Sequence, residues 1–423
     1  MPKNSTQIVH SFSALSEAKN QLDLLELQLL KRRLKTTESA SKVRPVIQGR
    51  ELKAFCSNDY LGLANHPLII DALIRGAQQY GAGSGASHLI SGHSEIHAAL
   101  EQFLAHTQKL SIPNARALFF STGYLANLCA ITGFARLGKL KEGSGRINIY
   151  SAKLNHASLI DGVKLAAAQT GAQIFLFDHR NLNELESQLN QEKKRFSDAH
   201  QLIVIDGVFS MDGDIAPITK LVELANQFDA LLMVDDAHGF GVLGKHGSGL
   251  LELEKIQSER IVYIGTLSKA AGISGAFVCA DAHLIEWLVQ KGRPYIYSTA
   301  TPPAIANALM QSVEIIQGKE GQARRAHLGE LIHLWKSEVR FKKWQLSESN
   351  TPIQVLILGS NEDALEASRR LDQAGFWIPA IRPPTVPKDS ARLRITFSAE
   401  HSKEDVLELV KALHLIEEGI ILK

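Results

Sequence analysis

The sequence predicts an α/β protein in which helices flank a mostly parallel central sheet. Two observations carry this prediction. From Arg116 onward, short and continuously apolar runs alternate with helical patterns, which is typical of parallel strands buried on both faces. Polar residues also stand where these runs end, the edge at which an open α/β sheet binds its ligands. The expected strands contain ALFF, INIY, IFLF, LIVID, LLMVDD, IVYIG and AFVCA.

Three units are expected along the 423 residues. Residues 1–60 form an N-terminal helix and arm, because leucines recur at helical spacing between Leu15 and Leu34. Residues 61–300 form the large α/β domain. The proline pair 302–303 then interrupts the pattern, and strand IQVLILG, helix EDALEASRRLDQAG, strands FWIPAI and ARLRITF and a last helix follow. Residues 301–423 are therefore expected to form a small α+β C-terminal domain.

Composition argues against several classes of function. The formal net charge is +2, from 46 Lys and Arg against 44 Asp and Glu, so neither a nucleic-acid nor a membrane partner is expected. Three cysteines lack CxxC spacing, which argues against a zinc site or a disulfide framework. The chain shows neither a secretory signal nor a run of about 18 apolar residues. A cytoplasmic protein without a metal is the expectation.

Lys269, in GTLSKAAGISGA, stands among small residues and hydroxyls, which is unusual for a solvated lysine. Burial lowers the pKa of a lysine and makes its neutral amine able to form an imine or accept a proton. Asp235 ends the earlier apolar run LLMVDD and could keep a pyridinium nitrogen protonated. Together they indicate pyridoxal phosphate. The alternative is that Asp235 and Asp236 cap a loop and Lys269 faces solvent; the apolar strand before each residue argues against it.

Two further positions could contact such a cofactor. His156, in NHASLIDG, follows a strand and opens a helix, where its imidazole could stack on a planar ring or only cap the helix. Gly123 and Tyr124, in FFSTGYLAN, begin another helix, whose N-terminal amides could bind phosphate. In HSEIH, His93 and His97 are interpreted as two histidines on a helix face rather than metal ligands. The glycine-rich stretch 81–92 follows a helical pattern, which argues against a dinucleotide-binding loop.

Taken together, these motifs resemble those of the α-oxoamine synthases, pyridoxal-phosphate enzymes of fold type I, from about Leu22 to Leu415. The resemblance rests on SNDYLGLANHP, NHASLIDG, GVFSMDGDIAP, VDDAHGFGVLG, TLSKAAG, YIYSTATPPA and AIRPPTVP. Three positions depart from the usual family pattern. His88 stands where Arg is usual, Asp206 where Glu is usual, and TLSKA where TFGKA is common.

The resemblance implies a role for each matching residue. Lys269 would hold the cofactor through an imine, Asp235 would pair with the pyridine nitrogen, and His156 would stack on the ring. It further assigns cofactor contacts to Gly123, Tyr124, Ser210, His238 and Thr266, and substrate contacts to Lys31, Asn58, Arg382 and Thr385. Arg382 suits the bidentate grip of a carboxylate.

The implied activity is a decarboxylative condensation of an amino acid with an acyl thioester in a homodimer. AIRPPTVP favours the family member that uses L-alanine and a pimeloyl thioester, carried by acyl carrier protein or by CoA. The alternatives are sister enzymes, namely glycine C-acetyltransferase, 5-aminolevulinate synthase and serine palmitoyltransferase. A fold type I aminotransferase is another class, and a catalytically dead partner subunit is disfavoured because Lys269, Asp235 and His156 are all present.

Overall fold

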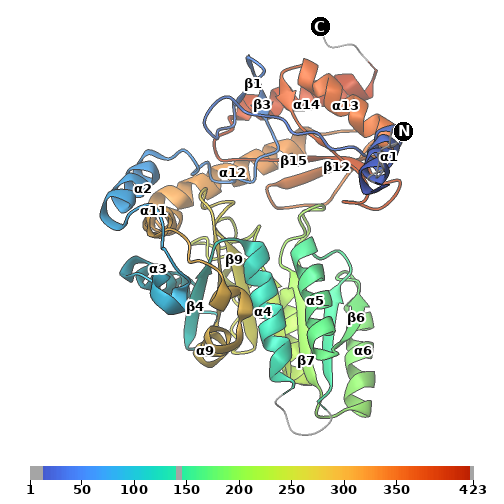
Figure 1. Ribbon diagram of the computed structural model, residues 1–423. Helices are drawn as coiled ribbons and strands as arrows, with labels where there is room; N and C mark the ends of the chain where they lie inside the picture. The colour runs from blue at the N-terminus through green and yellow to red at the C-terminus, as the bar shows by residue number, and fades with distance from the viewer. Residues whose placement is uncertain (1–12, 140–144, 420–423) are drawn as a thin grey trace, which may run out of the picture.

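A seven-stranded sheet forms the centre of the larger part of the molecule (Figure 1). The computed structural model describes residues 13–139 and 145–419. Strand order is β4-β10-β9-β8-β7-β5-β6, and β10 alone in this sheet runs antiparallel to its neighbours, so the predicted mostly parallel sheet is confirmed. The strands are β4 (Ala115–Phe120), β5 (Ile147–Ala152), β6 (Gln173–Phe177), β7 (His200–Asp206), β8 (Ala230–Asp235), β9 (Ile261–Thr266) and β10 (Ala276–Asp281).

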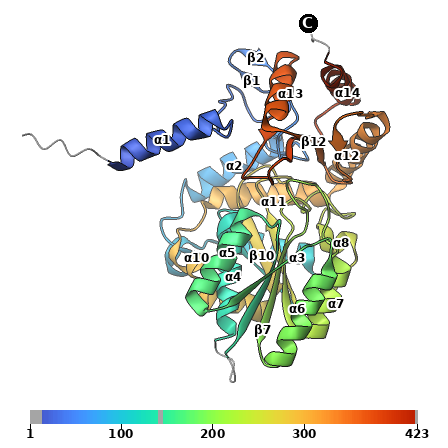
Figure 2. The ribbon, with the colours of Figure 1, turned by 90° about the vertical axis from the view of Figure 1, so that its right-hand side faces the viewer.

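Helices cover both faces of this sheet, as Figure 2 shows for α4 and α5 on one side and α6 and α7 on the other. Alternate residues of β7 supply both cores: Leu202 and Val204 join one apolar cluster, and Ile203 and Ile205 join the other. Helices α4 (Gly123–Leu137), α5 (Ala157–Thr170), α9 (Ala282–Lys291) and α10 (Arg293–Tyr297) contribute to the first cluster. The second includes α3 (Glu95–Gln108), α6 (Leu182–Arg195), α7 (Ile218–Phe228), α8 (Leu250–Leu253) and α11 (Pro303–Gln317).

A four-stranded antiparallel sheet of order β11-β12-β15-β14 forms the second, smaller layer, at the top of Figure 1. Its strands are β11 (Gln345–Leu346), β12 (Ile353–Gly359), β14 (Ala380–Ile381) and β15 (Ala391–Thr396), with helices α12 (Lys319–Glu338), α13 (Asn361–Gln373) and α14 (Lys403–Glu417). The segment before the large sheet joins this part, because β3 (Lys53–Ala54) pairs with β13 (Phe376–Trp377). It also contains β1 (Val46–Ile47) and β2 (Arg50–Glu51).

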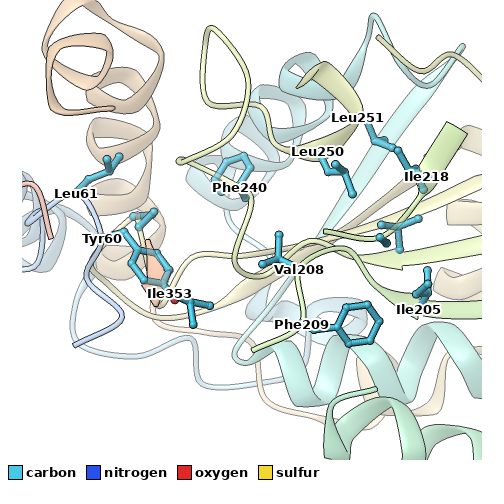
Figure 3. Close-up of a cluster of buried hydrophobic side chains, with 14 of the residues drawn as sticks. Tyr60, Leu61, Ile205, Val208, Phe209, Ile218, Phe240, Leu250, Leu251 and Ile353 are labelled. Carbon is cyan, nitrogen blue, oxygen red and sulfur yellow. The ribbon is translucent and has the colours of Figure 1, made fainter. Parts of the chain in front are cut away.

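Helix α11 follows the proline pair and packs against α2 (Pro67–Tyr80) and α3 of the larger part. The two parts also share one apolar core. Figure 3 shows Tyr60 from the N-terminal segment, Val208 and Phe209 after β7, and Ile353 at the start of β12. These side chains belong to the same buried cluster. The carboxyl ends of the large sheet are therefore covered by the smaller part, which places any site there in a protected junction.

The N-terminal helix is shorter than expected. Helix α1 spans Ser13–Leu27, not residues up to Leu34, because Leu29 adopts a left-handed backbone with φ of 56° and the chain then runs without helical structure. None of the residues of α1 is buried. Within the residues that the structure describes, no helix has both the length and the apolarity needed to cross a membrane.

Candidate active site

Lys269 lies three residues beyond β9, at the carboxyl edge of the sheet. Its Nζ is 2.9 Å from Nε2 of His238, and Nδ1 of His238 is 2.6 Å from the hydroxyl of Tyr60. Burial lowers the pKa of Lys269 to about 8, and the carboxylates of Asp235 and Asp206 oppose that shift. A lysine with this pKa is partly neutral near physiological pH, as imine formation requires.

His238 is itself buried and neutral. Desolvation holds its pKa well below the usual range, and the nearby positive charges of Lys269 and Arg394 lower it further. Because a neutral imidazole has one donor and one acceptor nitrogen, His238 can connect the phenol of Tyr60 to the amine of Lys269.

Two carboxyl groups meet at the ends of β7 and β8, where Asp206 and Asp235 are directly paired in the register. Asp235 accepts hydrogen bonds from Nδ2 of Asn127 at 2.6 Å and from the amide of Ala237 at 3.1 Å. Asp206 accepts one from the amide of His156 at 2.7 Å. Desolvation, followed by the charge of Asp235, raises the pKa of Asp206 well above its usual range. The environment of Asp206 therefore favours its neutral form over its ionised form.

His156 precedes α5 and caps it. Its Nδ1 accepts a hydrogen bond from the amide of Ser158 at 3.2 Å and lies 2.7 Å from the hydroxyl of the same residue. Although the residue is exposed overall, partial desolvation lowers the pKa of the imidazole, an effect that Asp235 opposes and Lys269 reinforces. The result is a fixed, neutral ring with an accessible face, which suits stacking on a planar group.

The N-terminus of α4 forms a possible phosphate cradle. Thr122 caps the helix by accepting from the amide of Leu125 at 3.2 Å. Gly123 lies so close to Thr266 that an added Cβ would sit 3.3 Å from its Oγ1. The exposed Ser121 follows β4 directly. Free helix N-terminal amides beside hydroxyl groups are well suited to an anion. Tyr124 is 43% exposed and donates a hydrogen bond to Asp161.

Arg394, on β15, is a site residue that the sequence patterns did not reveal. Only 8% of it is exposed, and its guanidinium donates to the carbonyl of Ser210 at 2.5 Å and to Oδ1 of Asn58 at 3.2 and 3.3 Å. The acceptors of its hydrogen bonds in the described chain are all neutral oxygens, yet its charge lowers the pKa of Lys269. The sequence feature that could have revealed Arg394 is a charged residue within the stretch ARLRITF, which forms a strand that is buried along its whole length.

The other predicted substrate residues lie elsewhere. Arg382 donates to the carbonyls of Leu29 and Lys31, the latter at 3.3 Å, and Arg32 donates to the hydroxyl of Thr385 at 3.1 Å. The amine of Lys31 is 3.1 Å from the carboxylate of Glu26. Lys31 and Arg382 line one cavity of about 370 Å³ beside α13. In the described part of the chain, no hydrogen bond joins this group to Lys269.

The HSEIH motif is only partly as predicted. His93 precedes α3 instead of lying on it, and hydrogen bonds to His88 at 2.9 Å between their Nδ1 atoms. His97 is fully buried, caps α3 and approaches the carbonyl of Thr301 at 2.7 Å. Over residues 13–139 and 145–419, no group of three or more His, Cys, Asp or Glu side chains could hold a metal ion.

The residues at this edge fit pyridoxal phosphate. A lysine amine of low pKa, a buried carboxylate and an accessible imidazole face surround the same region, and Gly123 keeps open the space beside Thr266 that a side chain would fill. Asn127 leaves its buried Oδ1 without a hydrogen-bond partner while both of its donor contacts point toward this group. Such an arrangement can accept a phosphate, a pyridinium nitrogen and an aldehyde.

Comparison with known proteins gives the class. The family model described as aminotransferase class I and II matches residues 51–413, so the chain belongs to this family. Within it, the 8-amino-7-oxononanoate synthase of Janthinobacterium sp. (strain Marseille) is 50% identical over 398 residues, which cover 94% of this chain and 97% of that protein. The resemblance expected from the motifs is confirmed.

Solved structures confirm the predicted fold. Serine palmitoyltransferase from S. paucimobilis, solved with a bound PLP–myriocin aldimine, has a TM-score of 0.83 and 25% identity, covering 96% of this chain and 98% of that one. The 8-amino-7-oxononanoate synthase of Francisella tularensis has a TM-score of 0.69 and 27% identity, covering 87% and 97%.

Proposed function

We propose that this protein joins L-alanine to a pimeloyl thioester and releases CO2 and the free thiol, giving 8-amino-7-oxononanoate in biotin biosynthesis. Pyridoxal phosphate is the proposed cofactor. The observation that carries the proposal is the half-buried amine of Lys269, which lies 2.9 Å from Nε2 of His238 and at the same sheet edge as the Asp235 carboxylate. Relatives with half of their residues identical to this chain bear the name of that activity.

When bound, pyridoxal phosphate supplies an electron sink that stabilises negative charge at the Cα of the amino acid. The chain supplies the remainder. Asp235 would pair with the ring nitrogen, His156 would cover one ring face, and the amides at the start of α4 together with Thr266 would hold the phosphate. Proton transfer falls to Nζ of Lys269, which His238 orients from 2.9 Å.

The amino-acid carboxylate is assigned to Arg394. This guanidinium is buried, lies close enough to Lys269 to lower its pKa, and has no carboxylate partner in the described chain. Both terminal nitrogens of Arg394 donate to Oδ1 of Asn58, which is a neutral acceptor. A substrate carboxylate could take the place of this oxygen and accept both hydrogen bonds. Lys31, Arg382 and Thr385 are assigned to the acyl thioester, from the cavity under the segment that follows α1.

A homodimer in the cytoplasm completes the proposal. Exposed apolar side chains gather on α2 and on the following loop, including Ile74 at 51% and Ile90 at 80% exposure, and Tyr297 is 70% exposed. Such a surface fits a second copy of the chain. The cysteines at 56, 129 and 279 are all free, as a reducing compartment favours.

The test is an assay of the purified protein loaded with pyridoxal phosphate. We expect L-alanine and pimeloyl-CoA to yield 8-amino-7-oxononanoate by mass spectrometry, with one CO2 and one thiol released per product. L-serine with palmitoyl-CoA is the comparison, since the fold is shared with serine palmitoyltransferase. Product from the second pair alone would reassign the substrates, and failure to bind the cofactor would reject the proposal. Light scattering at the monomer mass would reject the dimer.

A further inference from the structure

Asn127 connects the two groups that would contact the cofactor ring, although it lies within α4 and only 1% of it is exposed. Its Nδ2 donates to Oδ2 of Asp235 at 2.6 Å and to Oγ of Ser158 at 2.9 Å. The hydroxyl of Ser158 in turn lies 2.7 Å from Nδ1 of His156. A single amide therefore bridges the carboxylate and the imidazole.

The direction of these hydrogen bonds follows from the donors. Because the hydroxyl of Ser158 accepts from Asn127, its own hydrogen is free to donate to Nδ1 of His156, which also accepts the amide of Ser158. Nδ1 is thus an acceptor, and the proton of the neutral ring lies on Nε2. The backbone amide of Ser158 already selects this tautomer, and the hydroxyl that Asn127 orients adds a second donor to Nδ1.

The orientation of the Asn127 amide is itself constrained. Turning it over would place Oδ1 against the carboxylate of Asp235, so the NH2 group faces Asp235 and Ser158. In this orientation Oδ1 is buried without a partner. A residue kept only for packing would not leave a buried polar atom unpaired. The two N–H groups of Asn127 are therefore the polar atoms that this side chain uses in the fold.

The same amide distinguishes the two buried carboxyl groups. Asp235 accepts two hydrogen bonds, from Asn127 and from the amide of Ala237, whereas Asp206 accepts one, from the amide of His156. Donors stabilise an ionised carboxylate, so the better-supplied member of the pair carries the charge.

Other charged or titratable groups surround this pair. Those that act on it or on its neighbours are Lys269 beyond β9, Asp236 and His238 after β8, His156 before α5, and Arg394 on β15. The positive charge of Lys269 favours one negative charge in the pair, and the burial of both carboxyls disfavours two.

We propose that Asn127 is a positioning residue that places the single negative charge of the carboxyl pair on Asp235 and, by orienting the hydroxyl of Ser158, gives Nδ1 of His156 a second hydrogen-bond donor. The proposed function identifies the ring that Asp235 and His156 contact, and the inference rests on it in that respect. The hydrogen-bond network itself belongs to the chain, so it can be measured without turnover.

The experiment uses full-length protein with labelled aspartate and histidine, before and after loading with pyridoxal phosphate. Carboxyl ¹³C shifts, assigned with Asp206→Asn and Asp235→Asn, give the titration midpoint of each aspartate, and ¹⁵N shifts give the tautomer of His156. In wild type we expect Asp235 ionised, Asp206 protonated and His156 protonated on Nε2 at pH 7. Asn127→Leu should raise the midpoint of Asp235 by one pH unit or more and move the ¹⁵N shift of Nδ1 of His156, because the hydroxyl of Ser158 loses the donor that orients it.

Two variants separate the halves of the network. Ser158→Ala should move the ¹⁵N shift of Nδ1 of His156, because the hydroxyl donor is lost, and should leave the midpoint of Asp235 in place, because the Asn127–Asp235 bond remains. Asp206→Asn, which resembles the protonated acid, should also leave the midpoint of Asp235 in place. If Asp206 carried the charge, Asp206→Asn would instead lower that midpoint, and the proposal would be overturned.

The matched control is Asn148→Leu, at a fully buried asparagine on β5 that bonds Arg146 and Gln201 away from the site. It should lower thermal stability without moving either NMR readout. Should Asn127→Leu fail to fold, Asn127→Ala, which leaves room for water, replaces it. A folded Asn127 variant with an unchanged Asp235 midpoint and an unchanged ¹⁵N shift of Nδ1 of His156 overturns the inference. If wild-type protein showed these NMR signatures but made no 8-amino-7-oxononanoate, the result would count against the proposed function and not against the role of Asn127.

Discussion

Nζ of Lys269 lies 2.9 Å from Nε2 of His238, and both groups are held away from their ordinary pKa values by burial. The pair forms a chain of hydrogen bonds that continues to the hydroxyl of Tyr60. Since burial disfavours the charged form of each group, a neutral amine is available where a carbonyl or a proton must be received. Keeping the amine of Lys269 in a desolvated position lowers the free energy of unfolding, and this loss can be measured.

Lys269→Met should stabilise the cofactor-free protein at pH 7. The pKa of Lys269 falls from 10.5 to about 8, and each pKa unit corresponds to about 1.4 kcal/mol, so the charged amine costs the fold up to about 3 kcal/mol. Below pH 8 both folded and unfolded chains are protonated and the cost is complete. Between pH 8 and 10.5 the unfolded chain binds more protons, so wild-type stability rises with pH.

Urea unfolding at pH 7 and at pH 10.5 checks this expectation. The gain of Lys269→Met over wild type should be largest at pH 7 and shrink toward zero at the higher pH. Lys220→Met, at an exposed lysine paired with Glu223, is the control and should show no such trend. A variant less stable than wild type at pH 7 would show that the amine is not strained by burial.

Gly123→Ala should weaken binding of pyridoxal phosphate by about tenfold, equivalent to about 1.4 kcal/mol. The new methyl would lie 3.3 Å from Oγ1 of Thr266, so one of the two must move within the phosphate cradle. Equilibrium titration of cofactor absorbance measures the effect. Gly329→Ala is the matched control, because Gly329 is exposed within α12 with open space around it. It should gain about 0.5–1 kcal/mol of stability and bind cofactor normally. Equal affinity in both variants would remove Gly123 from the site.

Arg394→Gln should raise the KM for L-alanine by about 10- to 100-fold, the range expected when one charge-assisted pair is lost. The reason is its burial beside Lys269 without a carboxylate of its own. Arg382→Gln tests the rival assignment, since Arg382 donates to the carbonyl of Lys31 instead. Its main effect should fall on the KM of the acyl thioester. The reverse pattern would return the amino-acid carboxylate to Arg382.

The residues of the candidate site differ in how far the sequence alone could predict them. Strand-end position and residue type predicted Lys269, Asp235 and His156 as site residues, because an apolar run followed by a polar residue is visible in the chain. Asn127 is 108 positions from Asp235, and nothing in a helical pattern tells which turn will face which strand. Arg394 lies inside a strand whose burial only the tertiary structure reveals. The strands of the sheet were predictable because their apolar runs are visible in the sequence. The antiparallel direction of β10 was not, because an apolar run does not show which way a strand runs.

Glu101→Gln should remove a pH-dependent loss of stability. Glu101 accepts the amide of Phe119 at 2.9 Å in a buried position near His93 and Arg116, and desolvation raises its pKa from 4.5 to about 7. Below pH 4.5 the carboxyl is protonated in both states and costs nothing. As the pH rises from 4.5 to 7, the unfolded chain ionises first, so the free energy of unfolding falls.

Above pH 7 the loss is complete and amounts to at most about 3 kcal/mol, from the same conversion of about 1.4 kcal/mol per pKa unit. Chemical denaturation at pH 4 and pH 8 measures it. Glu101→Gln keeps the acceptor for Phe119 without a charge, so it should match wild type at pH 4 and exceed it at pH 8. Glu366→Gln is the control with the opposite sign, because Arg369 and Arg370 lower the pKa of that carboxyl to about 2. It should gain nothing at pH 8. If Glu101→Gln lost stability at pH 8, the ionised carboxylate would be paired in solution, with protonated His93 or with Arg116.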